Sequence, residues 1–565
     1  GSDSDLTGAT NAISIGNKDA YSDSDFGLTG GVTTKDDIIN WMRGVDVKDE
    51  DDDTDTTVRY AMGDPLHSRP AAVVYGGTAT SPQAVIYTAT NDGYLHAIDA
   101  SNGAELWSYV PKELLPGMAR LYDDPDMTYK LYGIDGDVVP VTRDVDNDGV
   151  IEAGDGDFAL ILFGMRRGGS TYRMINVTDK NNPVLVWERV LDNGGQSWST
   201  PVVTRMDINA SGQNALKAVV VLGGGYDGVH DTPAFNAATD NVGAGVHVLD
   251  LLSGATLWEA GHTDSSTADL KLAKMTRAIP TRIKVIDING DGFADRMYSA
   301  DLGGQLWRFD ITNGNAAATV VAGGVIAQLG AEGLNNPKAA DTRRFYNSPD
   351  VAMFSDPKQN RRFMSVSIGS GYRAHPLNTS ANDRFYSIRD PNVFNSLTQI
   401  EYNALTPIVE NDLEDITGRV NVTVAADDDG WMFRVPDNQM ILADSVTFND
   451  EVFFVSFSPD SAGAAACNVG QGSNYLWRVS IINGDPIVDD LGSIPTDGED
   501  DARNKQLAQG GIAPSPQFLF PSPDDANCTG ADCAPPPLGC IGVECFDPGF
   551  TNNPVRTLWT QDGIE

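Results

Sequence analysis

The stretch Gly93-Tyr-Leu-His-Ala-Ile-Asp99 is a short run of strand-forming residues that ends in aspartate, and Gly103 and Leu106-Trp107 follow it. β-Branched and aromatic residues favour strands, whereas Gly, Asn and Asp between them favour tight turns. The unit around this stretch is expected to hold four strands, near residues 71–75, 84–89, 94–99 and 105–109. Four short strands in about 40 residues form one blade of a β-propeller.

The same unit recurs along the chain, which is typical of a protein built from supersecondary repeats. Clear copies of the stretch occupy residues 172–176, 246–250 and 305–310, and weaker copies occupy residues 384–390 and 475–480. Six units are legible, and a seventh is expected to be completed by a strand near Val58 or at residues 555–559. The sequence therefore predicts an all-β fold, a β-propeller of about seven blades. The recurring tryptophans are assigned to packing within the blades: Trp107, Trp187, Trp258 and Trp307.

The composition restricts the partners that the chain can bind through its overall charge. The 565 residues include 79 Asp and Glu against 39 Lys and Arg, for a formal net charge of −40. A field of this sign disfavours nucleic acid and anionic membrane surfaces and favours cations, although acidity can also serve solubility. No apolar run approaches the eighteen or so residues of a transmembrane helix, so no membrane insertion is expected.

Changes in texture divide the chain into three parts. Residues 1–57 are an acidic Ser/Asp/Gly-rich lead-in with one short helix, residues 58–520 are the propeller, and residues 521–565 are a Cys/Pro-rich segment that helps to close it. Four cysteines lie in the pattern Cys528-x4-Cys533-x6-Cys540-x4-Cys545, and Cys467 stands alone. The spacing lacks the C-x2-C of zinc sites, so local disulfides in an oxidising compartment are predicted.

The turn Asp287-Ile-Asn-Gly-Asp-Gly-Phe-Ala-Asp295 carries oxygen-bearing side chains at every second position before a glycine. Calcium prefers oxygen ligands at such spacing, with a carbonyl at the seventh position. The predicted ligands are Asp287, Asn289, Asp291, the carbonyl of Phe293, and Asp295. The alternative is an ordinary Asp/Asn/Gly surface turn.

A second stretch of this kind lies at the same position of the second unit, between its first and second strands. It reads Asp144-Val-Asp-Asn-Asp-Gly-Val-Ile-Glu-Ala-Gly-Asp155 and follows the calcium loop of EF-hands, with Asp in place of the final Glu. The predicted ligands of this second calcium site are Asp144, Asp146, Asp148, the carbonyl of Val150, and Asp155. The third unit opens the same way at residues 207–212 but lacks later acidic ligands, so that loop is expected to hold no ion.

Two further features are weighed as candidate sites. His67 lies between acidic and basic neighbours, but no second histidine or nucleophile stands at a telling spacing, so structural packing is the preferred interpretation. Gly223-Gly-Gly-Tyr-Asp227 invites a phosphate-loop interpretation, but no helical pattern follows it and a β-turn is preferred. Ser-x-Gly elbows and His-Glu-x-x-His are absent, and no catalytic residue is assigned.

Several motifs together resemble the C-terminal propeller of the PilY1-type type IV pilus biogenesis proteins, over about residues 41–559. They are Gly63-Asp-Pro-Leu-His-Ser-Arg-Pro70, Asn91-Asp-Gly-Tyr-Leu-His-Ala-Ile-Asp99, Ser197-Trp-Ser-Thr-Pro201, Gly223-Gly-Gly-Tyr-Asp227 and the block from Asp287 to Asp310. The resemblance implies a cell-surface or pilus-tip location, with transit through the periplasm. It also implies calcium in the 287–295 loop that antagonises pilus retraction, with effects on twitching motility and adhesion. The von Willebrand-like half that family members often carry, and an Arg-Gly-Asp tripeptide, are not in this sequence.

The leading hypothesis is therefore a non-catalytic, calcium-regulated module of pilus assembly and adhesion. Its expected partners are pilin or minor pilin subunits and host or surface ligands. One alternative is a quinoprotein-like dehydrogenase, because Leu-His-Ala-Ile-Asp followed by Gly-x-x-Leu-Trp is also typical of pyrroloquinoline quinone propellers. The adjacent cysteines common in those enzymes are missing. A second alternative is a structural propeller with constitutively bound calcium.

Overall fold

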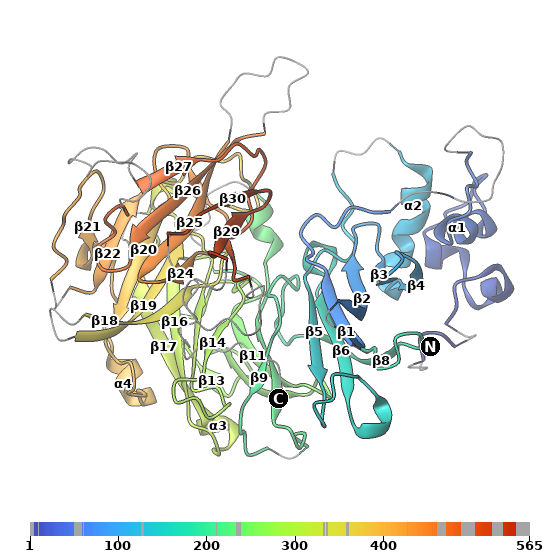
Figure 1. Ribbon diagram of the computed structural model, residues 1–565, viewed down its shortest axis with the longest axis horizontal. Coiled ribbons are helices and arrows are strands. Elements are labelled where there is room, and N and C mark those ends of the chain that lie inside the picture. Colours follow the sequence, from blue (N-terminus) through green and yellow to red (C-terminus); the bar gives the residue numbers. More distant parts are fainter. Residues whose placement is uncertain are drawn as a thin grey trace.

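The computed structural model describes residues 5–549 except for 9–10, 50–58, 60–61, 79, 126–128, 211, 233–238, 332–333, 335–336, 357–360, 426–427, 460–470, 488–502 and 522–534. Seven sheets follow one another along the chain and form a seven-bladed β-propeller (Figure 1). We number the blades 1 to 7 in chain order. The predicted fold class is confirmed.

Blades 1 to 4 hold strands β1 to β17, and within each blade almost every neighbouring pair is antiparallel. Blade 1 contains β1 (Ala71–Thr78), β2 (Ser81–Ala89), β3 (Leu95–Asp99) and β4 (Glu105–Tyr109). Blade 2 contains β5 (Val138–Arg143), β6 (Phe158–Gly164), β7 (Thr171–Asn176) and β8 (Val184–Val190). Blade 3 contains β9 (Val202–Arg205), β10 (Ala218–Gly223), β11 (Gly245–Asp250), β12 (Thr256–Gly261) and β13 (Leu270–Lys271), and blade 4 contains β14 (Lys284–Ile286), β15 (Arg296–Ala300), β16 (Gln305–Ile311) and β17 (Val321–Gln328).

Blades 5 to 7 are less regular. Blade 5 contains β18 (Asp350–Asp356), β19 (Arg361–Gly369), β20 (Arg384–Asp390), β21 (Glu414–Asp415) and β22 (Gly430–Arg434). Blade 6 contains β23 (Met440–Ile441), β24 (Val446–Phe448), β25 (Glu451–Ser458), β26 (Ser473–Ser480) and β27 (Asn504–Gln506). Blade 7 has three strands, β28 (Gln517–Leu519), β29 (Leu538–Ile541) and β30 (Glu544–Phe546), so it includes part of the segment 521–565. Residues 58 and 555–559, weighed as closing strands, lie outside the described residues.

The recurring stretch forms the third strand of every four- or five-stranded blade where the sequence placed it, as β3, β7, β11, β16, β20 and β26. In blades 3 to 6 a tryptophan from the repeat is fully buried: Trp258, Trp307, Trp431 and Trp477. Flat aromatic side chains fill the space between neighbouring sheets and bury a large apolar area each. The tryptophans are blade packing, as predicted.

Helices occupy the edges of the propeller. The predicted lead-in helix is α1 (Lys35–Met42), which is capped by Thr34 and packs through Ile38 and Ile39 against α2 (Met118–Asp123) beside blade 1 (Figure 1). The other helices are short, namely α3 (Ala317–Val320), α4 (Gln399–Ala404), η1 (Ile15–Ala20), η2 (Asp23–Phe26), η3 (Lys112–Gly117), η4 (Ala153–Asp155), η5 (Arg166–Gly168), η6 (Gly228–Asp231), η7 (Ala339–Asp341) and η8 (Glu410–Asp412). Among the described residues, no helix is both long and apolar enough to span a bilayer.

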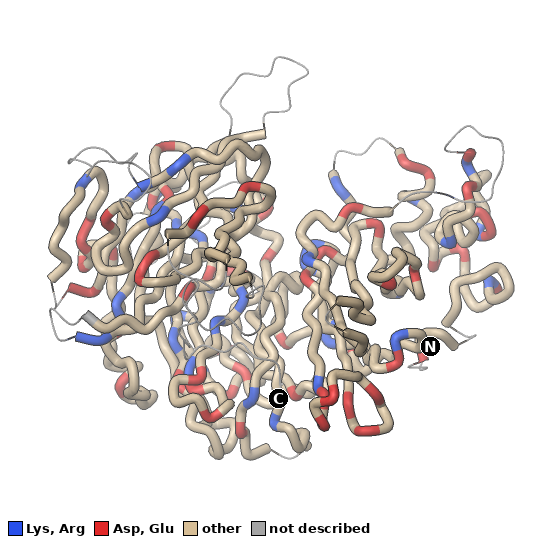
Figure 2. Tube along the Cα trace, viewed as in Figure 1, with Lys and Arg blue, Asp and Glu red and all other residues tan. Residues whose placement is uncertain are grey.

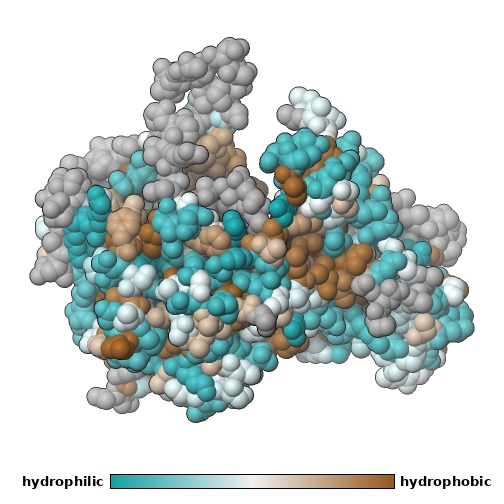
Figure 3. Space-filling view, turned by 90° about the horizontal axis from the view of Figure 1, so that it is seen from below, coloured by the Kyte–Doolittle hydropathy of each residue, from teal (hydrophilic) through white to brown (hydrophobic). Residues whose placement is uncertain are grey.

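The surface is mostly hydrophilic. The view from below in Figure 3 shows hydrophilic residues over most of the described face and a hydrophobic area right of centre, on the side that holds blades 1 and 2. Partly exposed apolar side chains in these blades include Val74 and Val190.

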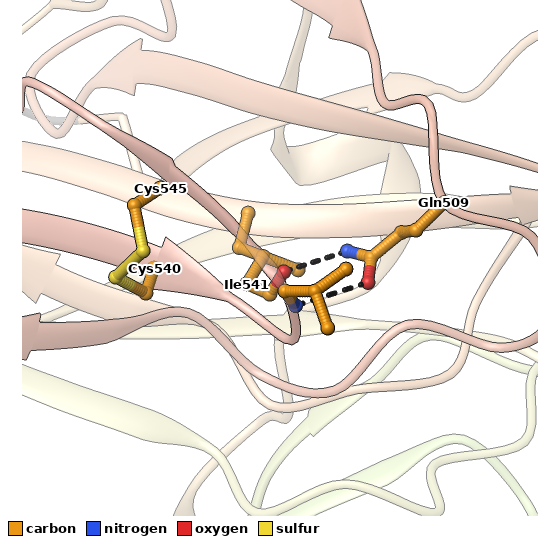
Figure 4. Close-up of a disulfide and its surroundings, with 5 residues drawn as sticks. Gln509, Cys540, Ile541 and Cys545 are labelled. Carbon is orange, nitrogen blue, oxygen red and sulfur yellow. Dashed lines mark hydrogen bonds between the residues drawn. A yellow bond between two sulfur atoms is a disulfide. The ribbon is translucent and has the colours of Figure 1, made fainter.

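Blade 7 contains the disulfide between Cys540 and Cys545, which joins β29 to β30 (Figure 4). The Gln509 side chain donates from Nε2 to the carbonyl of Ile541 at 2.7 Å and so attaches this hairpin to the chain that leaves blade 6. The Cys540–Cys545 disulfide is a local one, as predicted for the cysteines of this segment, whose pairing the sequence left open. Cys467, Cys528 and Cys533 lie outside the described residues.

Blades 4 and 5 are joined by a buried network of ion pairs centred on Asp310. Its carboxylate accepts hydrogen bonds from Arg296 Nε at 2.6 Å and from Arg308 Nη2 at 2.8 Å, and Arg308 also reaches Asp390 of blade 5 at 2.8 Å. The Tyr402 hydroxyl donates to Asp310 at 2.8 Å. Both arginines and Asp310 are at most 2 % exposed, so these charges depend on each other for compensation.

We expect Asp310→Ala to lower the free energy of unfolding by about 3–5 kcal/mol, because it leaves two buried guanidinium groups without their shared carboxylate. Urea unfolding followed by tryptophan fluorescence measures the loss. Glu414→Ala is the control, since it removes a partner of the half-exposed Arg419 and should cost no more than about 1 kcal/mol. Equal losses in the two variants would show that the buried network does not hold the blades together.

Candidate metal centre

The loop that joins β14 to β15 in blade 4 folds around its own carboxylates. Asp287 accepts from the backbone N–H of Gly290 at 2.7 Å and of Gly292 at 2.8 Å, and Asp291 accepts from the N–H of Phe293 at 2.8 Å. Asp295, the residue directly before β15, accepts from the N–H of Ile288 at 2.7 Å. Gly290 and Gly292 have φ of 76° and 83°, the left-handed values that glycine adopts without strain. The first and last carboxylates are thereby brought back toward each other.

The loop that joins β5 to β6 in blade 2 repeats this pattern. Asp144 accepts from the N–H of Asn147 and of Gly149, both at 2.8 Å, and Asp148 accepts from the N–H of Val150 at 2.8 Å. The loop projects from the lower edge of the molecule and carries several acidic residues (Figures 1 and 2). Two separate segments of sequence therefore adopt one backbone arrangement at one position of the blade.

The residue that completes the second loop is Asp157. Its carboxylate accepts from the N–H of Val145 at 2.8 Å, as Asp295 accepts from that of Ile288, and it directly precedes β6 as Asp295 precedes β15. Ligand oxygens of Asp144, Asp146 and Asp157 all lie within 4.8 Å of one another. Asp155, the ligand proposed from sequence, lies in η4 and is not part of this group.

Counting twelve positions from Asp144, as in an EF-hand, leads to Asp155. Counting back from the start of the second strand leads to Asp157, and this second count also gives Asp295 in blade 4. The five extra residues of the second loop are taken up by η4 and the residues around it. The start of the second strand therefore identifies the last aspartate of each loop, because it fixes where the chain returns to the sheet.

Electrostatic repulsion between the carboxylates is evident in both loops. Burial raises the pKa of Asp295, and the charges of Asp287 and Asp291 add to this effect. Removal from water together with the charge of Asp148 raises the pKa of Asp146. Like charges about 4 Å apart repel by roughly 4 kcal/mol at the effective dielectric of a protein surface. The donor sets contain only carboxylate, amide and carbonyl oxygens, which fit a hard divalent cation such as Ca²⁺ and offer no soft ligand.

The third loop, between β9 and β10, contains its own cation. The residue directly before β10 is Lys217, where the other two loops have Asp, and its Nζ lies 2.5 Å from Asp207 Oδ2. The ammonium group of Lys217 offsets the charge of the first aspartate of this loop. That the loop holds no ion stays a prediction, and Ser211 of this loop lies outside the described residues.

Each acidic loop is also attached to the preceding blade. The N–H of Ala294 donates to the carbonyl of Arg205 in β9 at 2.9 Å, and the Arg205 guanidinium lies 4.5 Å from the centre of the Phe293 ring. In blade 2, the N–H of Ile151 donates to the carbonyl of Tyr75 in β1 at 3.4 Å. Both contacts involve the eighth residue of the loop and the first strand of the neighbouring blade. The conformation of each loop is thus linked to a contact between blades.

The other sequence candidates lie elsewhere. His67 Nδ1 is 2.8 Å from a carboxylate oxygen of the fully buried Asp135, and burial lowers the pKa of this histidine. Gly225 of the glycine-rich stretch has a φ of 105°, and the stretch forms the turn after β10, not a cradle before a long helix. Neither residue approaches the acidic loops.

We expect Asp157→Ala to lower the thermal stability of the metal-free protein, whereas Asp155→Ala leaves it unchanged. Asp157 accepts two backbone N–H groups, from Val145 and Glu152, and these hydrogen bonds lower its pKa. The exposed Asp155 has no such role in closing the loop. Differential scanning calorimetry in the presence of a chelator makes the comparison. A larger loss of thermal stability in Asp155→Ala than in Asp157→Ala would favour Asp155, the residue at the twelfth position of the EF-hand pattern, as the one that completes the loop.

Comparison with known proteins places this geometry in a family context. No family model matches the chain. The type IV pilus biogenesis factor PilY1 of Pseudomonas aeruginosa is 28 % identical over 308 residues, which cover 49 % of this chain and 23 % of that protein. A PilY1 homolog of Xylella fastidiosa is 26 % identical over 232 residues, 40 % of this chain and 16 % of the homolog. The chain thus spans less than a quarter of the length of these curated relatives.

One solved structure shares the propeller fold. The crystal structure of the Pseudomonas aeruginosa PilY1 C-terminal domain superposes with a TM-score of 0.51 at 18 % identity, covering 82 % of this chain and 92 % of that domain. The quinohemoprotein alcohol dehydrogenase of Comamonas testosteroni reaches a TM-score of 0.35 at 13 % identity, covering 77 % of this chain and 59 % of that chain. The seven sheets and the curated relatives together support a resemblance of the chain to the PilY1-type C-terminal β-propeller.

Proposed function

We propose that this propeller is a calcium-binding module of type IV pilus biogenesis and adhesion that favours pilus extension over retraction and catalyses no reaction. One observation carries the metal assignment. Two loops with different sequences and lengths, at the same position of blades 2 and 4, fold so that each brings a distant aspartate back to its first one. A structural turn does not require this accumulation of negative charge, whereas a cation site does.

The residues of the blade 4 loop would have two different roles in binding the ion. Asp287, Asn289, Asp291, Asp295 and the carbonyl of Phe293 would hold the ion. Gly290 and Gly292 allow the backbone to turn around it. When bound, calcium supplies the positive charge that offsets repulsion between the carboxylates.

In blade 2 the corresponding ligands would be Asp144, Asp146, Asp148, the carbonyl of Val150, and Asp157. Asp157 takes the place that the sequence assigned to Asp155, because its carboxylate is the one that lies beside Asp144 and Asp146.

The contact with the preceding blade supports a regulatory consequence. Loss of the ion would leave the charges of Asp287 and Asp291 acting against that of Asp295 in the blade 4 loop, and the loop should open to separate them. Opening would pull Ala294 and Phe293 away from Arg205 in β9. Calcium concentration would therefore alter the surface offered at the boundary of blades 3 and 4, and this surface is where we place the contact with pilus components.

The relatives support the biological setting. Their names assign them to type IV pilus biogenesis, so the proposed location is the cell surface or the pilus, after transit through the periplasm. The proposed partners are pilin or minor pilin subunits and host or surface ligands. The Cys540–Cys545 disulfide suits an oxidising compartment of this kind.

Calcium titration tests the two sites separately. Isothermal titration calorimetry on the wild type should reveal two binding events. Asp287→Asn should remove one event and Asp157→Asn the other, each with a loss of affinity on the order of tenfold or more, because a carboxylate ligand loses its charge. The control is Asp155→Asn, which keeps both events.

The outcome of this titration tests the blade 4 site, the blade 2 ligand set and the calcium affinity separately. Two events in Asp287→Asn would overturn the blade 4 site. Loss of an event in Asp155→Asn with none in Asp157→Asn would overturn the revised blade 2 ligand set. A dissociation constant of roughly 10⁻⁴ to 10⁻³ M would suit an extracellular sensor, whereas one near or below micromolar would indicate the constitutive calcium of the structural alternative.

Pilus dynamics test the biological role. We expect this protein to restore twitching motility in a piliated strain that lacks its own PilY1-type protein. With Asp295→Ala, surface pili should fall in number at a calcium concentration that saturates the wild type, because retraction is no longer opposed. Lys217→Ala is the control, since it alters the loop that has its own cation. Unchanged pilus numbers in Asp295→Ala would contradict a regulatory role for this loop.

A further inference from the structure

A second cluster of charged residues lies at the opposite ends of the strands from the acidic loops. The acidic loops join first to second strands, whereas these residues come just before a first strand or just after a second one. Arg166 follows β6, Arg282 precedes β14 and Arg373 follows β19. Because neighbouring strands are antiparallel, all three lie at the other face of the propeller.

Arg166 of blade 2 and Arg373 of blade 5 lie close enough for the charge of one to act on the other, and Arg282 of blade 4 shares the charged neighbours Arg69 and Asp444 with Arg373. Positive charge on Arg373 disfavours the charged form of Arg166, and Arg69, which precedes blade 1, acts in the same way on Arg282 and Arg373. Residues of non-adjacent blades can approach each other only around the central axis of a propeller. The cluster therefore surrounds the axis at one face.

The nearby carboxylates are already engaged by other groups. Asp135 accepts from Asn91 Nδ2 at 3.1 Å and lies 2.8 Å from His67 Nδ1. Asp137 accepts from the N–H of Arg69 and from Thr200 Oγ1, both at 3.0 Å, and Asp444 accepts from the N–H of Ser348 at 2.9 Å.

The guanidinium groups, in contrast, lack carboxylate contacts. Among the described residues, no carboxylate oxygen lies within 4 Å of a side-chain nitrogen of Arg166, Arg282 or Arg373. Arg373 donates to the carbonyl of Leu442 at 2.5 Å and Arg166 stacks on Trp198, 4.6 Å from the ring centre. With Arg69, the arginines of the cluster exceed its three aspartates by one positive charge.

The surroundings make this excess of charge costly. Burial lowers the pKa of Arg166 to about 9, and the neighbouring Arg373 contributes to the shift. Burial likewise lowers the pKa of Arg282 and of Arg373. All three side chains keep part of their surface open to solvent, so a small solute can reach them. Guanidinium groups held in this way form charge-assisted, often bidentate hydrogen bonds to carboxylate and phosphate oxygens.

Aromatic side chains pack beside Arg166. Trp198 stacks on Tyr226 with ring centres 4.2 Å apart, and Tyr346 packs against both. The Tyr346 hydroxyl is buried and has no hydrogen-bond partner among the described residues. Trp198 and Tyr226 belong to the Ser-Trp-Ser-Thr-Pro and Gly-Gly-Gly-Tyr-Asp motifs, and Arg69 belongs to the Gly63–Pro70 motif. Motifs far apart in sequence thus meet at this cluster.

We propose that the axial cluster of Arg166, Arg282 and Arg373 is a binding site for a small oxyanion, a carboxylate or a phosphate. The bound group would accept hydrogen bonds from guanidinium nitrogens of different blades and supply the negative charge that the cluster lacks. The site is separate from the acidic loops, because it lies at the other ends of the strands. It does not depend on the calcium proposal.

Calorimetric titration with inorganic phosphate and with citrate tests this site, at constant ionic strength in chloride buffer without calcium. We expect saturable binding of one of them, accompanied by a change in tryptophan fluorescence. Arg282→Gln and Arg373→Gln should each weaken binding at least tenfold, and Trp198→Phe should abolish most of the fluorescence change. Arg120→Gln, an exposed arginine on α2 over Tyr129, is the matched control and should bind as the wild type does.

Each outcome of the anion titration either supports or contradicts the proposed site. Preference for citrate identifies a carboxylate site and preference for phosphate a phosphate site, provided that the arginine variants lose it. Absence of binding at millimolar concentration, or equal binding in Arg282→Gln, Arg120→Gln and the wild type, would overturn the proposal. Should Arg373→Gln fail to fold by circular dichroism, Arg282→Gln, whose residue is partly exposed, still gives the answer.

Discussion

The antiparallel order of strands within each blade is the constraint on which the rest of this structure depends. It sends every connection between first and second strands to one face and every connection between second and third strands to the other. The acidic loops of blades 2 and 4 therefore lie on one face, and the arginines that follow β6 and β19 lie on the other. Loops can lengthen or gain charge at either face without disturbing a single ladder hydrogen bond.

The two faces of the propeller concentrate charges of opposite sign. Asp287, Asp291 and Asp295 concentrate negative charge on one loop, and we propose that a cation controls its order. Arg166 and its neighbours concentrate positive charge around the axis, where several blades hold the side chains in place and little movement is available. The first arrangement suits a switch that responds to concentration, and the second suits a preorganised binding site.

Contacts with the preceding blade link the conformation of each acidic loop to a boundary between blades. Ala294 and Ile151 both donate to the first strand of the preceding blade. In blade 4, the strand that begins directly after Asp295 carries Arg296 into the buried network with Asp310. A loop bounded on one side by a neighbouring blade and on the other by a buried ion pair cannot change shape without affecting a blade boundary.

The sequence by itself determined the blades, because their signals are local. The repeat contains a strand that ends in Asp, a glycine after it and a buried tryptophan, all within about twenty residues. Such a short segment shows the period-two pattern of a strand directly. The spacing of Asp287, Asn289, Asp291 and Asp295 was equally local, and the backbone N–H groups of the same nine residues hold that loop.

Only the tertiary structure decided which residues meet across greater distances. Asp157, and not Asp155, lies beside Asp144 because it is the residue at which the chain re-enters the sheet before β6, and an intervening helical turn hides this from a count of positions. Lys217 pairs with Asp207 for the same reason, since it is the residue that re-enters the sheet in blade 3. The axial arginines are separated by about a hundred residues each, and no spacing rule connects them. They become neighbours because a propeller turns a linear series of blades into a ring.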